Sequence, residues 1–477
     1  MLRSTKIVAT LGPASSDPET LERMFLAGVD VVRMNFSHGT AADHERRAEL
    51  VRETCRKTGR TVGIMGDLQG PKIRVGKFKE GKVTLKPGDA FVLDADCEEG
   101  DERRVGLDYK ELPRDVRPGD VLLLDDGRIV FEVEKVIGNE VHCRVRHGGT
   151  LSNNKGINRL GGGLTAPALT QKDMEDIRTA AKIKVDYLAV SFPKSSADMY
   201  MARQLLRAAG GDAFLIAKIE RAEAVEPKAL TDIMSACEGI MVARGDLAVE
   251  VGDASVPALQ KRMIRVARGQ NKLTITATQM MESMVASPVP TRAEVSDVAN
   301  AVLDGTDAVM LSGESAVGKY PVKAVQAMAQ VIEGAEKYQL AYSRSRHRDE
   351  KVFQGTDEGI AMAVMYTANH MKVRAIVAIT ESGSTTLWMS RIRSDIPIYA
   401  FTRQEATRRR VTLYRGVYPV AFDVLRTEPQ SLYPTIFHML LELRLVDVGD
   451  LIIVTKGELS GIAGGTNSMQ ILRVTRS

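Results

Sequence analysis

The sequence is poor in cysteine, and the few cysteines that it has are spread along the chain. Only four occur in 477 residues, at Cys55, Cys97, Cys143 and Cys237, and no two of them form a CxxC pair. A disulfide framework or a cysteine-based zinc site would need closely patterned cysteines, so we expect neither. Four isolated thiols are typical of a protein from a reducing compartment.

Long hydrophobic runs and a strong charge of either sign are also missing. No apolar stretch approaches the length of a membrane span. The first strand-like run begins at Lys6, which leaves no room for a signal or transit peptide. The net charge is only +4, which by itself favours neither nucleic acid nor a membrane as a partner. We therefore expect a cytoplasmic protein that binds neither.

Several familiar catalytic motifs are absent as well. The chain contains no GxxxxGK[ST] and no GxGxxG, so a P-loop and a dinucleotide fingerprint are excluded. It contains no HExxH and no GxSxG, and its seven histidines do not cluster. These absences exclude the common zinc peptidases and serine hydrolases and disfavour a histidine-rich metal site.

What the sequence does have is a series of eight short apolar runs within the first 315 residues. Apolar runs of this length, separated by stretches of helical periodicity, are typical of parallel strands that are buried on both faces. Eight such strands, each followed by a helix, are the number that closes a (β/α)8 TIM barrel, an α/β fold. The runs begin at Lys6, Asp30, Val62, Asp186, Phe214, Gly239, Leu273 and Asp307.

The spacing of the runs predicts three domains. More than a hundred residues with short strands and turns separate the third run from the fourth, including a hairpin that turns at Gly138-Asn139. We expect a barrel over 1–71 and 167–343, an inserted all-β lid domain, itself a small β-barrel, over 72–166, and glycines 161–163 at its hinge. After a charged linker at 342–351, strands alternate with helices, which predicts a C-terminal open-sheet α/β domain over 352–477.

Charged and hydroxylated side chains follow the predicted barrel strands. Since alternate residues of a strand share a face, Lys218 and Glu220 should point the same way, as should Arg244 and Asp246. Two carboxylates from neighbouring strands, Glu220 and Asp246, suit Mg²⁺ or Mn²⁺. A structural Lys218–Glu220 ion pair is the alternative, which the second carboxylate disfavours.

Other strand ends point to the same mouth of the barrel. Arg33 offers a fork that matches phosphate geometry, and Asn35, Ser37, Asp67 and Thr278 add oxygens. His38 follows directly, and a loop role and a nucleotide contact are equally compatible with it.

A second anion site is predicted in the C-terminal domain. A strand runs into Glu381 and then Ser382, Gly383, Ser384 and Thr385, where a helix begins. Small hydroxylated residues at a helix start are typical of phosphate sites, although they also serve as ordinary caps. The glycine-rich segment 456–469 could form the opposite wall, with Arg391 nearby.

At this point the motifs resemble those of pyruvate kinase, specifically of bacterial forms, over essentially the whole chain. The segments that carry the resemblance are KIVATLGPAS, VVRMNFSHG, GDLQGPKIR, KIERAEAV, IMVARGDL, TATQMMESM, PTRAEVSDVANAVLDGTDAVMLSGE and the terminal GGTNSM.

The resemblance implies transfer of phosphate from phosphoenolpyruvate to ADP, giving pyruvate and ATP, as the final step of glycolysis. It implies catalytic roles for Arg33, Lys218 and Thr278, with Gly245 and Asp246 also at the substrate. It implies further that Glu220 and Asp246 hold Mg²⁺ (or Mn²⁺) and that a homotetramer is activated by a phosphorylated sugar or nucleotide. The residues that it assigns to the nucleotide are Asn35, His38, Arg74 and Lys155, and those of its monovalent-cation site are Asn35, Ser37 and Asp67.

One departure from the family pattern bears on cofactors. Lys72 stands where potassium-dependent members have a glutamate, so we expect that its ammonium replaces the monovalent cation and that K⁺ is not required. An Mg²⁺-dependent lyase or mutase that acts on a pyruvate enolate is the alternative function, because the same Arg, Glu and Asp constellation would serve it.

Overall fold

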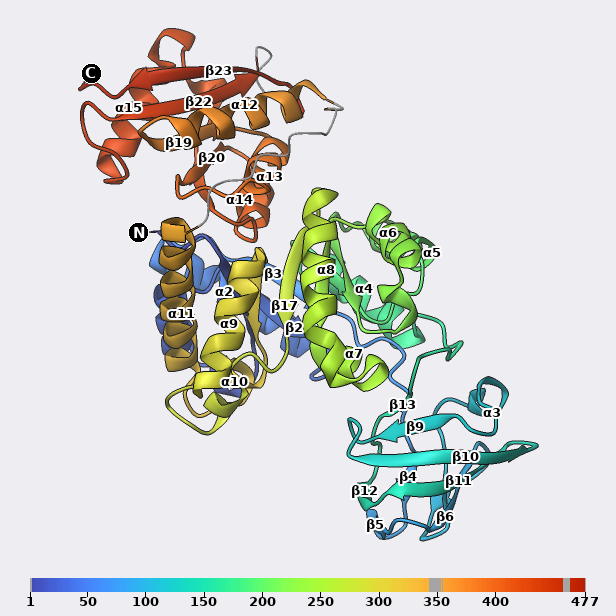
Figure 1. Ribbon diagram of the computed structural model, residues 1–477. Helices are drawn as coiled ribbons and strands as arrows, with labels where there is room; N and C mark the ends of the chain where they lie inside the picture. The colour runs from blue at the N-terminus through green and yellow to red at the C-terminus, as the bar shows by residue number, and fades with distance from the viewer. Residues whose placement is uncertain (1, 343–352, 354, 458–463, 477) are drawn as a thin grey trace.

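The computed structural model describes residues 2–342, 353, 355–457 and 464–476. Its centre is a closed barrel of eight parallel strands, one from each predicted apolar run (Figure 1). The fold prediction is confirmed. In order around the barrel the strands are β1 (Lys6–Thr10), β2 (Val31–Asn35), β3 (Gly63–Asp67), β14 (Tyr187–Val190), β15 (Phe214–Ile219), β16 (Gly239–Ala243), β17 (Leu273–Ala277) and β18 (Ala308–Leu311).

Helices surround the strands, and their ends follow local sequence signals. A capping box is present at Thr291, whose hydroxyl accepts a hydrogen bond from the Glu294 amide while the Glu294 carboxylate accepts one from the Thr291 amide. The helices are α1 (Pro18–Ala27), α2 (Ala41–Thr58), α4 (Gln171–Lys182), α5 (Ser196–Ala208), α6 (Pro227–Ser235), α7 (Arg244–Val251), α8 (Val256–Gly269), α9 (Arg292–Asp304), α10 (Gly313–Ala316) and α11 (Pro321–Tyr342).

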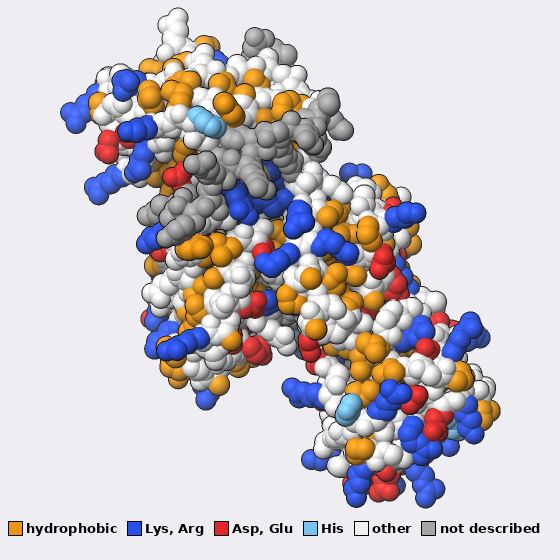
Figure 2. All heavy atoms as spheres, viewed as in Figure 1, with side chains coloured by type: hydrophobic (Ala, Val, Ile, Leu, Met, Phe, Trp, Pro, Cys, Tyr) orange, Lys and Arg blue, Asp and Glu red, His pale blue; other side chains and the backbone are white. Residues whose placement is uncertain are grey.

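The inserted segment is all-β apart from one short helix, and it projects from the barrel with lysine, arginine and acidic side chains interspersed over its surface (Figures 1 and 2). The predicted hairpin is present, because Ile137 pairs with Glu140 across the Gly138-Asn139 turn. A six-stranded sheet has the order β13-β9-β10-β11-β6-β8, and β12-β5 and β4-β7 form two small sheets. The elements are β4 (Lys77–Phe78), β5 (Lys82–Leu85), β6 (Ala90–Asp94), β7 (Glu99–Gly100), β8 (Arg104–Val105), α3 (Leu112–Asp115), β9 (Val121–Leu124), β10 (Ile129–Ile137), β11 (Glu140–His147), β12 (Gly149–Ser152) and β13 (Ile157–Arg159).

The C-terminal domain is an open sheet of order β21-β20-β19-β22-β23, with only the β22–β23 pair antiparallel. The predicted linker lies almost entirely outside the described residues, as does part of the 456–469 loop. The elements are α12 (Thr356–His370), β19 (Val373–Ile379), α13 (Ser384–Ser390), β20 (Ile398–Thr402), α14 (Glu405–Val411), β21 (Val417–Ala421), α15 (Leu432–Glu442), β22 (Leu451–Gly457) and β23 (Thr466–Arg473).

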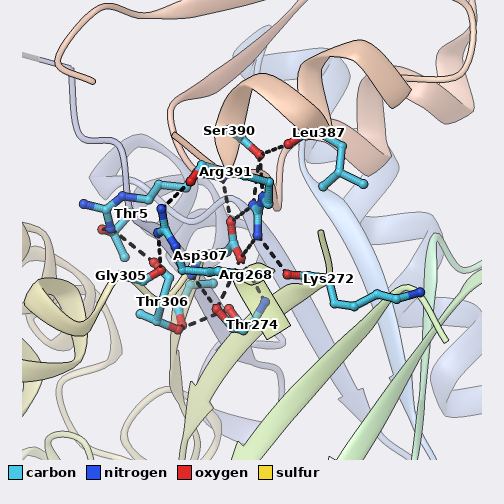
Figure 3. Close-up of polar contacts among 12 residues, drawn as sticks. Thr5, Arg268, Lys272, Thr274, Gly305, Thr306, Asp307, Leu387, Ser390 and Arg391 are labelled. Carbon is cyan, nitrogen blue, oxygen red and sulfur yellow. Dashed lines mark hydrogen bonds and ion pairs between the residues drawn. The ribbon is translucent and has the colours of Figure 1, made fainter. Parts of the chain in front are cut away.

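This domain closes the amino end of the barrel. Interior side chains such as Val8, Met65 and Met241 belong to one apolar cluster with Leu413 and Tyr414 of the C-terminal domain. Polar contacts also join the two domains (Figure 3). The Arg391 guanidinium donates to the Asp307 carboxylate and to the Lys272 carbonyl. The carboxyl ends of the strands are therefore the end of the barrel that is left for a site.

None of the helices among the described residues combines the length and the hydrophobicity that crossing a bilayer would require.

Candidate active site

The Lys218 ammonium is the centre of a charged cluster at the carboxyl ends of the strands. It lies 2.9 Å from Glu220 Oε1 and 3.2 Å from Asp67 Oδ1, and it donates to Ser191 Oγ at 2.7 Å. Lys218 and Glu220 therefore lie side by side, as their spacing predicted. Burial lowers the pKa of Lys218, but Asp67 and Glu220 outweigh it, so that the pKa lies above its ordinary value and the side chain stays charged.

Arg33 approaches the same buried carboxylate from the neighbouring strand. Its Nε lies 2.5 Å from Asp67 Oδ2, and its Nη1 donates to Thr10 Oγ1 at 3.1 Å. Burial alone would raise the pKa of Asp67, but Arg33 and Lys218 hold it below its usual value. One ionised carboxylate thus fixes two cationic groups, which provides a preorganised place for a phosphoryl group.

The electrostatic environment of Glu220 differs from that of Asp67. Burial, together with the nearby Asp246 carboxylate, raises its pKa to about 7 although Lys218 acts in the opposite direction. Its Oε2 accepts a hydrogen bond from the Phe192 amide at 3.0 Å. Two carboxylates that repel each other when both are ionised are suited to share a hard divalent cation. Among the described residues there is no group of three or more His, Cys, Asp or Glu that could hold a metal, and Mg²⁺ commonly takes only one or two protein carboxylates.

The expectation that Arg244 and Asp246 share a strand face is wrong. Strand β16 ends at Ala243, and both residues lie in the first turn of α7. Because successive helical residues point in different directions, the two side chains separate. Arg244 forms an ion pair with Asp297 at 2.7 Å and donates to the Thr278 carbonyl at 2.7 Å. It holds the chain after β17, and Asp246 alone faces the mouth.

Thr278 has a backbone conformation that is rare for its residue type. Its φ is +66°, in the left-handed region that β-branched residues avoid. Its hydroxyl accepts a hydrogen bond from the Gly245 amide at 2.9 Å and donates to the Ala277 carbonyl at 2.7 Å. A strained residue fixed by these contacts is characteristic of functional sites. Thr278 and Gly245 thus lie together, as expected.

A cleft of about 620 Å³ separates this mouth from the inserted domain. Its barrel side includes Asp246, Thr278 and Ser312, and its other side includes Asp126 at the turn between β9 and β10. A cleft of this volume accommodates a nucleotide or a small metabolite.

Lys72 reaches into the cleft from the junction between the two domains. Its ammonium lies 3.3 Å from Asp246 Oδ1 and 3.8 Å from Asp126 Oδ1. In the described part of the chain it makes no ion pair with Asp67, whose two oxygens contact Arg33 and Lys218. Its positive charge therefore lies beside Asp246. Of the three residues assigned to a monovalent cation, Asn35 uses Oδ1 to accept from the Ser37 amide.

Two of the predicted nucleotide residues, Arg74 and Lys155, come together where the inserted segment begins and ends. Arg74 and Gly156 form a β-bridge, which brings Arg74 beside the segment of Lys155. The Arg74 guanidinium donates to the Asn154 carbonyl at 3.1 Å, and the Lys155 ammonium lies 2.7 Å from Asp125 Oδ1. His38 is exposed in the turn after β2.

In the C-terminal domain, the predicted anion loop joins β19 to α13. Ser382 and Ser384 are half-buried, and their hydroxyls lie 3.2 Å apart. Thr385 is buried and its hydroxyl bonds to that of Thr466 at 2.8 Å, so the loop does face the start of β23. The suggestion that Arg391 belongs to this site is wrong, since its guanidinium is buried against Asp307 at the barrel.

Sequence reasoning missed two features of the site. Asp126 gave no signal, because it lies in an ordinary turn of the inserted segment. The contact between Lys72 and Asp246 was also not foreseen, since 174 positions separate the two residues and only the placement of the inserted domain joins them.

Comparisons with known proteins agree with this geometry. Residues 2–325 match the family model described as pyruvate kinase, barrel domain, and residues 358–472 match that of pyruvate kinase, alpha/beta domain. The chain is 55% identical to pyruvate kinase II of Salmonella typhimurium, with 99% of each chain covered. It is 55% identical to pyruvate kinase of Haemophilus influenzae over 96% of each chain, and 42% identical to that of Corynebacterium efficiens over 99% of this chain and 98% of the relative. The chain therefore belongs to the pyruvate kinase family of phosphotransferases.

Proposed function

We propose that the protein transfers the phosphoryl group of phosphoenolpyruvate to ADP in an Mg²⁺-dependent reaction, giving pyruvate and ATP as the final step of glycolysis. The observation that carries this proposal is the convergence of Arg33 and Lys218 on the buried Asp67 carboxylate, next to Glu220. Phosphoryl transfer needs positioning and charge neutralisation more than a covalent nucleophile, and this cluster offers both.

Each cationic group has a distinct task in this reaction. Arg33 presents a planar fork that binds the transferring phosphoryl group in a fixed orientation. Lys218 is a compact charge, and it stabilises the negative charge that develops on the enolate oxygen as the phosphate leaves. The ion pairs with Asp67 keep both groups oriented before the substrate arrives.

Glu220 and Asp246 are the residues that would hold the divalent cation, which would supply further charge neutralisation when it is bound. Burial, together with the neighbouring Asp246 carboxylate, raises the pKa of Glu220, which fits a site that is built for a cation. We assign Thr278 and Gly245 to the substrate side of the site, where the Thr278 hydroxyl would lie near the face at which the enolate is protonated to give pyruvate.

A turnover assay tests the proposal directly. With Mg²⁺ or Mn²⁺, phosphoenolpyruvate and ADP should give pyruvate and ATP in equal amounts, and omission of ADP should stop the reaction. Pyruvate or carbon–carbon bond products formed without ADP would instead indicate the alternative Mg²⁺-dependent lyase or mutase, which the family does not favour.

We propose in addition that Asn35, His38, Arg74 and Lys155 bind the nucleotide and that K⁺ is not required. Lys72 brings a positive charge to the mouth at 3.3 Å from Asp246, which supports a role in the charge balance of the site. Activity should be the same in buffers that contain K⁺ or only a tetraalkylammonium ion, and Lys72→Glu should acquire K⁺ dependence. A wild-type enzyme that is inactive without K⁺ would reject this part, and Asn35, Ser37 and Asp67 would then hold the ion.

For regulation, we propose that a phosphorylated sugar or nucleotide binds at Ser382, Gly383, Ser384 and Thr385 and activates a cytoplasmic homotetramer. The half-buried Ser384 is a better test than Thr385, which is buried and bonded to Thr466. Ser384→Glu places a carboxylate among the proposed phosphate contacts, so activation should be lost while basal turnover is kept. Light scattering of the purified protein measures the subunit number.

A further inference from the structure

A second concave surface lies at the opposite end of the barrel, where the end of α2 faces α14. It is a cleft of about 440 Å³ that five arginines line, with Glu405 as the only acidic residue among the lining. Arg52, Arg56 and Arg60 come from the barrel, and Arg408 and Arg409 come from the C-terminal domain.

The nearby carboxylates neutralise only one of these arginines. Arg409 pairs with Asp186 at 2.9 Å and with Glu405 at 2.6 Å. Arg52 donates to the Ile183 carbonyl at 2.5 Å, which fixes its position but carries no countercharge. In the part of the chain that the structure describes, no Asp or Glu forms an ion pair with the other three arginines of the cleft.

Solvated arginines on a convex surface would be unremarkable, but these line a cavity from both sides. A concave arrangement of one charge sign focuses the field and raises the local concentration of anions. Burial raises the pKa of the Cys55 thiol in the same cleft, so no thiolate offsets the arginines. Guanidinium groups match the geometry of phosphate oxygens.

We propose that the cleft between α2 and α14 binds the phosphate monoester of a small metabolite, as an anion site separate from the Ser382–Thr385 loop. The volume exceeds what inorganic phosphate fills, which leaves room for the body of a sugar or a nucleoside. The ligand would be held by Arg60 from the barrel and Arg408 from the C-terminal domain at the same time.

A ligand in this cleft would contact elements that lead to the predicted effector loop on one side and to the active site on the other. On the C-terminal side, the Thr407 hydroxyl of α14 donates to the Glu381 carbonyl at 2.6 Å, next to the predicted effector loop. On the barrel side, Gly63 at the start of β3 packs so closely that an added Cβ would lie 3.0 Å from the Arg409 carbonyl. Strand β3 ends at Asp67 in the active site. A bridging ligand would therefore favour one arrangement of the two domains.

Isothermal titration calorimetry of the full chain without divalent metal, with ribose 5-phosphate, AMP and inorganic phosphate as separate probes, tests the proposal. Arg60→Gln and Arg408→Gln should each weaken binding about tenfold at the cleft, as expected for the loss of one charged hydrogen bond. The matched control is Arg114→Gln/Arg426→Gln, whose arginines are 82% and 89% exposed and whose removal changes the net charge equally. Tighter binding of the two organic probes than of inorganic phosphate would assign the ligand class.

Hydrogen exchange locates the binding. A bound probe should protect amides of 52–62 and 405–411, and this protection should survive Ser384→Glu but not Arg60→Gln/Arg408→Gln. The double variant should keep its melting temperature and its basal turnover, which separates this test from that of the catalytic proposal. Unchanged affinity in the double variant, binding that only Ser384→Glu abolishes, or no binding of any probe at millimolar concentration would each overturn the proposal.

Discussion

At the carboxyl end of the barrel strands, the side chains of Lys218 and Arg33 are 12% and 11% exposed while they share the buried Asp67. At the amino end, Arg391 and Asp307 also form an ion pair, but both side chains are only 1% exposed. The C-terminal domain contributes Arg391 and packs over the second pair, whereas the first lies at the carboxyl ends of the barrel strands. Ion pairs of the same chemistry can therefore hold a substrate at one end and hold two domains together at the other.

The two ends of the barrel also differ in backbone strain. Thr278 has a left-handed backbone beside the cleft. At the interface, Asp307 has no left-handed backbone, and it accepts a hydrogen bond from the Thr274 amide at 2.9 Å in addition to those from Arg391. Complete hydrogen bonding is typical of a structural pair, whereas partly exposed cationic groups beside a strained residue are typical of a site.

The largest expected effect concerns stability at the amino end. Asp307→Asn leaves the Arg391 charge buried without a partner, which should cost about 3–5 kcal/mol of unfolding free energy. Urea denaturation measures this loss. The surface pair between Glu111 and Arg114 is the control, and Glu111→Gln should cost no more than about 1 kcal/mol. Turnover of the folded Asp307→Asn enzyme should stay near the wild-type value, and a large loss of kcat would show that the interface also serves catalysis.

The next effect concerns catalysis at the carboxyl end. Lys218→Met removes the charge that we propose meets the developing enolate and should lower kcat of the folded enzyme about 10²–10³-fold. Its control is Lys6→Met at the amino end, where the buried ammonium donates to the Val417 carbonyl at 2.6 Å. We expect near-normal kcat for Lys6→Met. Equal kcat losses in the two variants would contradict the assignment of catalysis to the carboxyl end of the barrel and of a structural role to the amino end.

The smallest expected effect is the pH dependence of Mg²⁺ affinity. The pKa of Glu220 is raised to about 7, so the group is protonated below that pH and ionised above it. Because a divalent cation needs the carboxylate, the Mg²⁺ affinity of the free enzyme should fall about tenfold from pH 8 to pH 6. Asp67 has a lowered pKa and contributes nothing in this window.

Calorimetric titration with Mg²⁺ measures this dependence. Glu250 is a useful comparison, because burial raises its pKa to about 7 as well, but it accepts from the Ala222 amide at 2.8 Å outside the proposed metal site. Glu250→Gln should therefore retain the pH dependence of Mg²⁺ affinity. A flat profile in the wild-type enzyme would show that Glu220 is ionised throughout the range.

Local sequence patterns determined the strands and most of the residues at the mouth. Each barrel strand was predicted because a buried parallel strand needs an uninterrupted apolar run. The pairing of Lys218 with Glu220 followed from the two-residue period of a strand. The same rule failed for Arg244 and Asp246, because the chain enters a helix immediately after Ala243.

Tertiary structure alone decided which charges meet. Asp67 precedes Lys218 by about 150 positions, and their contact requires a closed barrel that brings β3 and β15 to one mouth. The sequence could not show that Lys72 contacts Asp246, or that Arg391 lies against Asp307, since both contacts join separate domains. The charge of a side chain follows from its residue type, but its exposure and its partners depend on what packs against it. Exposure and partners determine whether an ion pair is structural or functional.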